Sequence, residues 1–119
     1  MTSRPAPDIL GAVKERRRFV RAQPQPDYSI TVHSGDRELG VLDVSVGGFG
    51  VSESDLPVGG ELPLRIELPR GASIEARAEV RYVHAAGAGL SLVDPSADVT
   101  RALGAYVGEL LERGAVLRP

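Results

Sequence analysis

Between residues 28 and 93 the sequence alternates apolar and polar side chains, and this period of two constrains the fold more than any other feature. Successive side chains of a β-strand point to opposite faces, so such alternation buries one face and leaves the other in water. The runs Leu62–Leu68 and Ile74–Tyr82 show it most clearly. Glycine, proline and aspartate between the runs predict turns at Gly35-Asp36, Pro57–Gly60 and Pro69–Gly71. Six or seven short strands at this spacing predict a mainly β fold, a barrel or a sandwich, and we expect an antiparallel β-barrel over residues 28–93.

After residue 93 the apolar pattern changes to the spacing of a helix. The residues that form one stripe are Val99, Leu103, Tyr106, Val107 and Leu110. Asp94 suits the N-cap position and Pro95 the first helical position. Gly114 is a natural helix end. We therefore predict one amphipathic C-terminal helix over residues 96–113, lying against the barrel or against a partner.

Length and composition exclude several classes of protein. The 119 residues fit one domain. The absence of cysteine excludes disulfides and thiolate metal sites, and no apolar run approaches the ~18 residues of a membrane-spanning helix. The first ten residues contain Asp8, two prolines and no apolar run, so they do not resemble a signal peptide. We expect a cytoplasmic protein that does not insert into a membrane.

The charge is divided unevenly along the chain. Residues 1–21 carry six basic and two acidic side chains, a net charge of +4, whereas the remainder carries eight arginines and fourteen acids, a net charge of −6; together they give the net charge of −2. A basic arm on an acidic body favours a local anion and disfavours general binding of nucleic acid. Aromatic residues make up only 4% of the chain, which further disfavours a nucleic-acid-binding strand face.

The basic arm contains the run Arg16–Arg21, which reads RRRFVR. A guanidinium presents a planar fork of donors that matches a phosphate bidentately. The same fork matches the O6 and N7 acceptors of guanine and stacks on a purine face. Several arginines on one short arm therefore suit a ligand that contains both phosphates and guanines. The plainer alternative is that a terminal arginine run is simply solvated.

A second pattern, Asp43-x-Ser45-x-x-Gly48, precedes a glycine-rich strand. The Asp43 carboxylate accepts hydrogen bonds only, which suits the N1–H and N2–H₂ donors of guanine. Ser45 offers a hydroxyl to a phosphate or a base, and Gly48 leaves room for a ligand to approach the backbone. Taken alone, the same pattern is also a common turn in which Asp and Ser bind nearby backbone groups.

The two patterns, in this order and with a strand-rich body, resemble the PilZ domain family. The family's RxxxR motif corresponds to Arg17 and Arg21, and its DxSxxG motif to Asp43, Ser45 and Gly48. The strand Gly87–Val93, followed by an amphipathic helix, is also similar to the family. The resemblance covers residues 14–113 and implies an arginine arm at 14–24, a six- to seven-stranded PilZ-type barrel at 28–93 and a helix at 96–113. Residues 1–13 would be a flexible segment and 114–119 a tail.

The resemblance implies that the chain is a receptor for cyclic di-GMP. Arg17 and Arg21 would contact phosphate and guanine from the arm, which would be mobile until the ligand draws it across the barrel. Asp43 and Ser45 would hold the other side of the nucleotide, and Gly48 would permit close approach. An additional arginine at the position of Arg16 accompanies capture of two stacked nucleotides in the family.

Other residues suggest no competing chemistry. His33 and His84 lack metal-ligand neighbours, and Tyr28, Tyr82 and Tyr106 are expected to pack within the barrel or helix. No nucleophile–base set or carboxylate pair has supporting spacing, so we expect neither an enzyme nor a cofactor. A ligand-binding module of this kind acts by contact, so we expect an unidentified protein partner. The alternative is a PilZ-like adaptor that contacts proteins without binding a nucleotide.

Overall fold

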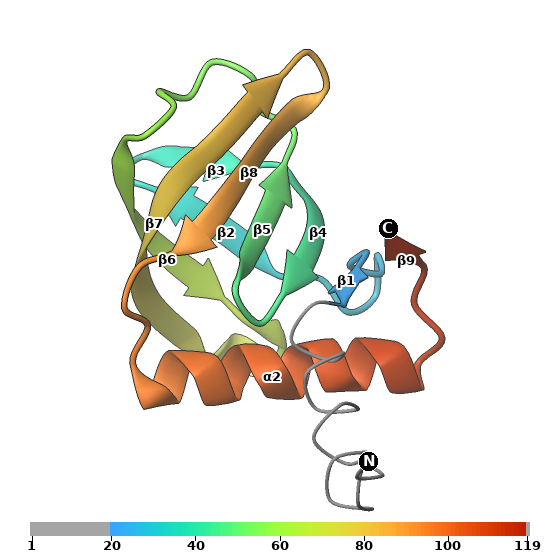
Figure 1. Ribbon diagram of the computed structural model, residues 1–119. Helices are drawn as coiled ribbons and strands as arrows, with labels where there is room; N and C mark the ends of the chain where they lie inside the picture. The colour runs from blue at the N-terminus through green and yellow to red at the C-terminus, as the bar shows by residue number, and fades with distance from the viewer. Residues whose placement is uncertain (1–19, 119) are drawn as a thin grey trace, which may run out of the picture.

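The computed structural model describes residues 20–118, which form one antiparallel sheet and one long helix (Figure 1). The strand order is β3-β2-β6-β7-β8-β5-β4-β1-β9. The sheet elements in chain order are β1 (Arg21–Ala22), β2 (Thr31–Ser34), β3 (Arg37–Leu39), β4 (Val41–Ser45), β5 (Gly48–Val51), β6 (Glu61–Glu67), β7 (Ser73–His84), β8 (Gly87–Leu92) and β9 (Leu117–Arg118). The 3-10 turn η1 (Pro69–Gly71) joins β6 to β7, and helix α2 (Ala97–Glu112) follows β8.

The predicted antiparallel pairing is confirmed, but the expectation of a closed barrel with six or seven strands is wrong. Within residues 20–118 the sheet has nine strands and is open, with β3 and β9 at its edges. One predicted strand divides at Gly40, so that β3 pairs with β2 whereas β4 pairs with β5. The Gly40 N–H donates to the Glu53 carboxylate, and the Gly40 carbonyl accepts from the Ser52 N–H. The backbone groups of Gly40 are therefore satisfied outside a continuous strand. The remaining additional strands, β1 and β9, have two residues each, too few to show a period.

The core lies between the curved sheet and helix α2, which crosses the end of the sheet (Figure 1). The predicted helix stripe is confirmed: the buried residues of α2 are Val99, Leu103, Tyr106, Val107 and Leu110. The Tyr106 hydroxyl donates to the Tyr28 carbonyl at 2.8 Å, and the two rings stack with centroids 5.5 Å apart. Burial raises the pKa of Tyr106, so this hydroxyl keeps its proton across the physiological range. The helix is thereby fixed to the segment that precedes β2.

The two ends of α2 follow from capping chemistry. The prediction of Asp94 as N-cap is wrong: Ser96 is the N-cap, and its hydroxyl accepts from the Val99 N–H at 3.2 Å. The helix ends as predicted at Gly114, whose φ of 77° lies in the left-handed region that glycine adopts without strain. The N–H groups of Gly114 and Ala115 donate to the carbonyls of Leu111 and Leu110, the pattern of a Schellman motif. This cap turns the chain back toward the sheet.

None of the helices within residues 20–118 combines the length and apolarity needed to cross a membrane.

Candidate functional site

The structure brings together two of the residues singled out from the sequence, Arg21 and Asp43. Arg21 lies on β1, which pairs with β4 through Ala22 and Val44. This pairing places the Arg21 guanidinium 2.7 Å from the Asp43 carboxylate, Nη1 to Oδ1. The Asp43 side chain is 9% exposed and that of Arg21 is 32% exposed. The ion pair is therefore shielded on the carboxylate side, and the guanidinium retains access to solvent. The expectation that the arm is mobile without ligand is wrong for Arg21 and Ala22, which pair with β4; the arm before residue 20 lies outside the described residues.

Strand β5 fixes the Asp43 carboxylate from the other side. Asp43 lies opposite Gly50 in the β4–β5 register, and the Gly50 N–H donates to Asp43 Oδ1 at 3.1 Å. A Cβ at Gly50 would lie 2.6 Å from Asp43 Oδ2, so no side chain fits there without displacing the carboxylate. The structure thus gives Asp43 the role of orienting Arg21, because the bonded oxygen accepts from Arg21 and from the backbone together.

Ser45 and Gly48 close the β4–β5 turn beside this ion pair. They are direct partners in the register, and the Ser45 hydroxyl lies 3.4 Å from the Gly48 carbonyl, a long hydrogen bond. A Cβ at Gly48 would lie 1.9 Å from the Leu90 carbonyl oxygen. Contact with the β8 backbone therefore requires glycine at this position, before any ligand is considered. The spacing of the sequence pattern therefore reflects the packing of β4, β5 and β8 against one another.

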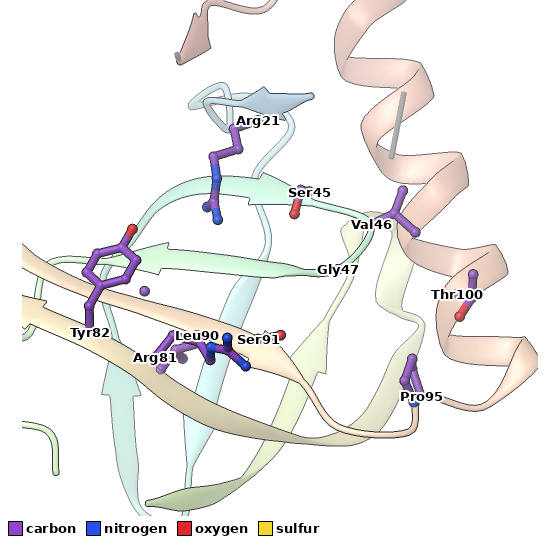
Figure 2. A pocket seen from close by; sticks show the side chains of 11 residues that line it. Arg21, Ser45, Val46, Gly47, Arg81, Tyr82, Leu90, Ser91, Pro95 and Thr100 are labelled. Atoms are coloured by element: carbon purple, nitrogen blue, oxygen red, sulfur yellow. The ribbon is translucent and has the colours of Figure 1, made fainter. Parts of the chain in front are cut away.

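A cavity of about 700 Å³ opens beside Arg21 and Ser45 (Figure 2). Its size falls within the usual range for small-molecule sites. Arg21 and Ser45 line it, whereas Asp43 and Gly48 are not among its lining residues. Arg16 and Arg17 lie outside the described residues, so the structure does not place them. The remaining wall comes from the β4–β5 turn, from β7 and β8, and from the start of α2, at Val46, Gly47, Arg81, Tyr82, Gly89, Leu90, Ser91, Pro95 and Thr100.

Arg81 and Tyr82 are site residues that the sequence reasoning missed. Figure 2 shows them across the cavity from Arg21. The alternation along β7 assigned Tyr82 to packing, but the register with β8 shifts between Val80 and Tyr82, and Tyr82 is 47% exposed. This irregularity breaks the period of two, so neighbouring residues both reach the surface.

A sequence signal for Tyr82 lies on the partner strand. Tyr82 pairs with Gly89, and a Cβ at Gly89 would lie 2.3 Å from the tyrosine ring. The ring also stacks on His84, with centroids 5.6 Å apart and an interplanar angle of 14°. Glycine opposite an aromatic residue is thus the feature that allows the ring to lie flat on the sheet. The ring is presented on a rigid surface at the cavity wall.

The arrangement suits a ligand that is both anionic and aromatic. Two guanidinium groups supply planar donor forks: Arg21, which pairs with Asp43, and Arg81, which lies 3.4 Å from Glu79. The hydroxyls of Ser45, Ser91 and Thr100 add neutral hydrogen-bonding groups, and Tyr82 adds an exposed ring. Within residues 20–118, His, Cys, Asp and Glu side chains do not gather in groups of three or more that could hold a metal ion.

Comparison with known proteins gives one family. The PilZ domain family matches residues 15–109. An uncharacterized protein of Aquifex aeolicus is 34% identical over 98 residues, which span 78% of this chain and 48% of that protein. The chain therefore spans about half the length of this relative.

Three solved structures resemble the fold. An uncharacterized Legionella protein has a TM-score of 0.63 at 16% identity, covering 79% of this chain and 96% of that one. The Bacillus subtilis inhibitor of motility (MotI/DgrA) has a TM-score of 0.60 at 21% identity, covering 79% and 47%. The PilZ domain of CeSA from a cellulose-synthesizing bacterium has a TM-score of 0.51 at 18% identity, covering 69% and 90%. At these identities the likeness concerns the fold alone.

Proposed function

Because this chain belongs to the PilZ domain family, a family of cyclic di-GMP receptors, we propose that it binds cyclic di-GMP in the cavity beside Arg21. The observation that carries the proposal is the Arg21–Asp43 ion pair at the cavity wall. It holds a guanidinium in one orientation before any ligand arrives. A preorganised donor fork binds more tightly than a mobile one, since less conformational entropy is lost on binding.

The described residues suggest a division of roles. Arg21 contacts a phosphate or the O6 and N7 edge of a guanine, and Asp43 orients it from behind. Ser45 contributes a hydroxyl, and Arg81 supplies charge from β7. Tyr82 provides a ring on which a base can stack. Arg16 and Arg17 complete the site from the arm, in agreement with the motif spacing of the family.

The family binds cyclic di-GMP and interacts with proteins, so we infer that nucleotide binding here changes contacts with a protein partner. PilZ domains are binding domains, and we propose a receptor rather than an enzyme. Isothermal titration calorimetry of the unmutated chain with cyclic di-GMP is the direct test. Saturable binding supports the receptor function. The titration is run at concentrations at which a micromolar affinity is measurable, and absence of a binding signal there leaves only the adaptor role.

Selectivity is the first specific prediction. Guanine presents the O6 and N7 acceptors to an arginine fork, whereas adenine places its N6–H₂ donor where guanine has O6. We therefore expect cyclic di-AMP to bind at least tenfold more weakly, about 1.4 kcal/mol or more. Competition calorimetry with both nucleotides on the same sample measures the ratio. Equal affinities would show that the site recognises phosphates without reading the base.

Stoichiometry is the second prediction. Two stacked molecules of cyclic di-GMP bring four phosphates, which require more positive charge than one molecule does. Arg16, Arg17 and Arg21, together with Arg81 on the opposite wall, supply that charge. We expect about two nucleotides per chain, and Arg16→Leu is expected to lower that number toward one. A ratio of one for the unmutated chain would contradict stacked binding while leaving the receptor proposal intact.

A further inference from the structure

The base of the arginine arm is hydrogen-bonded to the chain segment that follows helix α2. Strand β1 pairs antiparallel with β9, with Arg21 opposite Arg118 and Ala22 opposite Leu117. The Gln23 N–H donates to the Val116 carbonyl at 2.8 Å. Figure 1 shows β9 returning from the end of the helix to lie beside β1. The residue that lines the cavity and the tail of the domain therefore share one strand pair.

In this strand pair the backbone N–H and C=O groups of Arg21 face β9. Backbone groups of successive residues in a strand point alternately to its two sides. Because Gln23 bonds to β9, Arg21 faces β9 as well, whereas Ala22 faces β4, where it pairs with Val44. The Arg21 side chain is thus held by Asp43 on β4, and its main chain is held by Arg118 on β9.

Arg113, the C-cap of α2, contacts the chain a few residues after β1. Its guanidinium donates to Gln25 at 2.8 Å and to Asp27 at 2.6 Å, and it lies over the Tyr28 ring at 4.5 Å. The Gln25 side chain donates back to the Arg113 carbonyl at 3.3 Å. The segment from Arg21 to Tyr28 is therefore anchored by the end of α2 and by β9.

We propose that β9 is a positioning element for nucleotide binding, so that pairing of the tail with β1 and occupancy of the cavity are coupled. This inference rests on the proposed function. When β9 is paired, Arg21 is held on both sides and the site is complete. When β9 separates, β1 keeps its pairing with β4 and its contact with α2 but loses the hydrogen bonds to the Arg21 backbone, and affinity falls with the fraction of chains in which the site is complete. A two-residue strand at a sheet edge is weakly held, so small changes shift this fraction.

Coupling of this kind is reciprocal. If pairing of the tail raises the affinity for the nucleotide by some factor, the nucleotide strengthens pairing of the tail by the same factor. Occupancy of the cavity would thereby be reported at Val116 and Leu117, whose side chains are 61% and 54% exposed.

The strand alternation supplies a matched pair of variants in the full chain. The Arg118 N–H faces β1, so Arg118→Pro removes a hydrogen bond to Arg21. The Leu117 N–H faces away from β1, so Leu117→Pro keeps the pairing and, like any proline at such an edge position, is tolerated. Arg118→Ala keeps the N–H and removes only the charge. All three are titrated with cyclic di-GMP by calorimetry and melted by circular dichroism.

We expect Arg118→Pro to weaken binding about two- to tenfold, the range for one backbone hydrogen bond. Leu117→Pro should bind as the unmutated chain does, and all should melt at the same temperature. Arg118→Ala measures the effect of losing the side chain, so Arg118→Pro should bind about two- to tenfold more weakly than Arg118→Ala. Equal affinity of the two Arg118 variants would overturn the coupling. In the unmutated chain, saturating nucleotide should slow amide exchange at Arg118 by the same factor, measured by NMR, while Leu39, whose N–H faces Val32 at the other sheet edge, stays unchanged.

The outcomes separate the two proposals. The coupling is overturned if Arg118→Pro and Leu117→Pro bind with equal affinity. It is also overturned if the amide exchange rate at Arg118 does not change when the nucleotide is added. In both cases the proposed receptor function is unaffected. If the unmutated chain binds no cyclic di-GMP, the proposed function and the coupling both fail. Should Arg118→Pro not fold, the exchange measurement on the unmutated chain decides the question alone.

Discussion

Replacing Arg21 with alanine is expected to abolish detectable binding of cyclic di-GMP. The substitution removes the guanidinium that lines the cavity and that pairs with the buried Asp43 carboxylate. A charge-assisted contact contributes roughly 1.5–3 kcal/mol, or about ten- to hundredfold in affinity. Arg17→Ala should have an effect of similar size through the other arginine of the motif. Ser45→Ala removes one neutral hydroxyl and should cost less than about tenfold.

A loss of binding by Arg21→Ala has to be separated from a loss of folding. Without Arg21 the Asp43 carboxylate retains its bond from the Gly50 N–H, so we expect a destabilisation of only about 1–2 kcal/mol. Arg21→Lys keeps a cation for Asp43 but loses the planar fork, so it should melt near the unmutated protein and still bind at least tenfold more weakly.

The matched control for charge is Arg65→Ala. Arg65 lies on β6, its side chain is 56% exposed and lies 3.6 Å from Glu67, and it does not line the cavity. Its loss should leave both affinity and melting temperature unchanged. Calorimetry and thermal melting of all these variants test the assignment. Normal affinity in Arg21→Ala would remove Arg21 from the site.

Replacing Gly48 with alanine should destabilise the fold strongly, whether or not a ligand is present. The new Cβ would lie 1.9 Å from the Leu90 carbonyl oxygen, and that oxygen belongs to backbone, which cannot rotate away. The β5–β8 pairing, in which Gly48 lies opposite Ser91, would have to separate locally. Overpacking of this kind costs about 3 kcal/mol, which corresponds to a fall of about 10 °C in melting temperature.

Gly47→Ala is the control for this prediction. Gly47 is the neighbouring residue in the same turn, and a Cβ there meets no atom within 4 Å. Its melting temperature should match that of the unmutated chain. If Gly48→Ala melts normally as well, the close approach of β8 is not what requires glycine. A defect of Gly48→Ala confined to nucleotide binding would instead favour the role in ligand approach that the motif suggests.

The faces of the strands and of the helix were predictable because they depend on residues close together in the sequence. The buried positions Leu64, Ile66, Ala78 and Val80 follow the period of two, and the stripe of α2 follows its helical spacing. The alternation failed where the register with β8 shifts, and Tyr82 was therefore misassigned. Gly40, which divides one strand into two, also gave no periodic signal, so the expected strand number was too low.

The sequence by itself determined the chemistry available near the site: an arginine arm, an acceptor carboxylate, a serine hydroxyl and several glycines in a strand-rich chain. Membership of the PilZ family agrees with those motifs. These features are local, since residue type and spacing decide what each group can donate, accept or leave open. The sequence does not contain the distances between such groups.

The tertiary structure alone decided which groups act together. Arg21 meets Asp43 because β1 pairs with β4, and Arg81 and Tyr82 join the cavity because β7 is irregular beside Gly89. The tail reaches Arg21 because the Gly114 cap turns the chain back and β9 completes the strand pair. Each of these contacts joins segments far apart in the chain. Their formation depends on packing of the whole sheet against α2, for which no short stretch of sequence carries a signal.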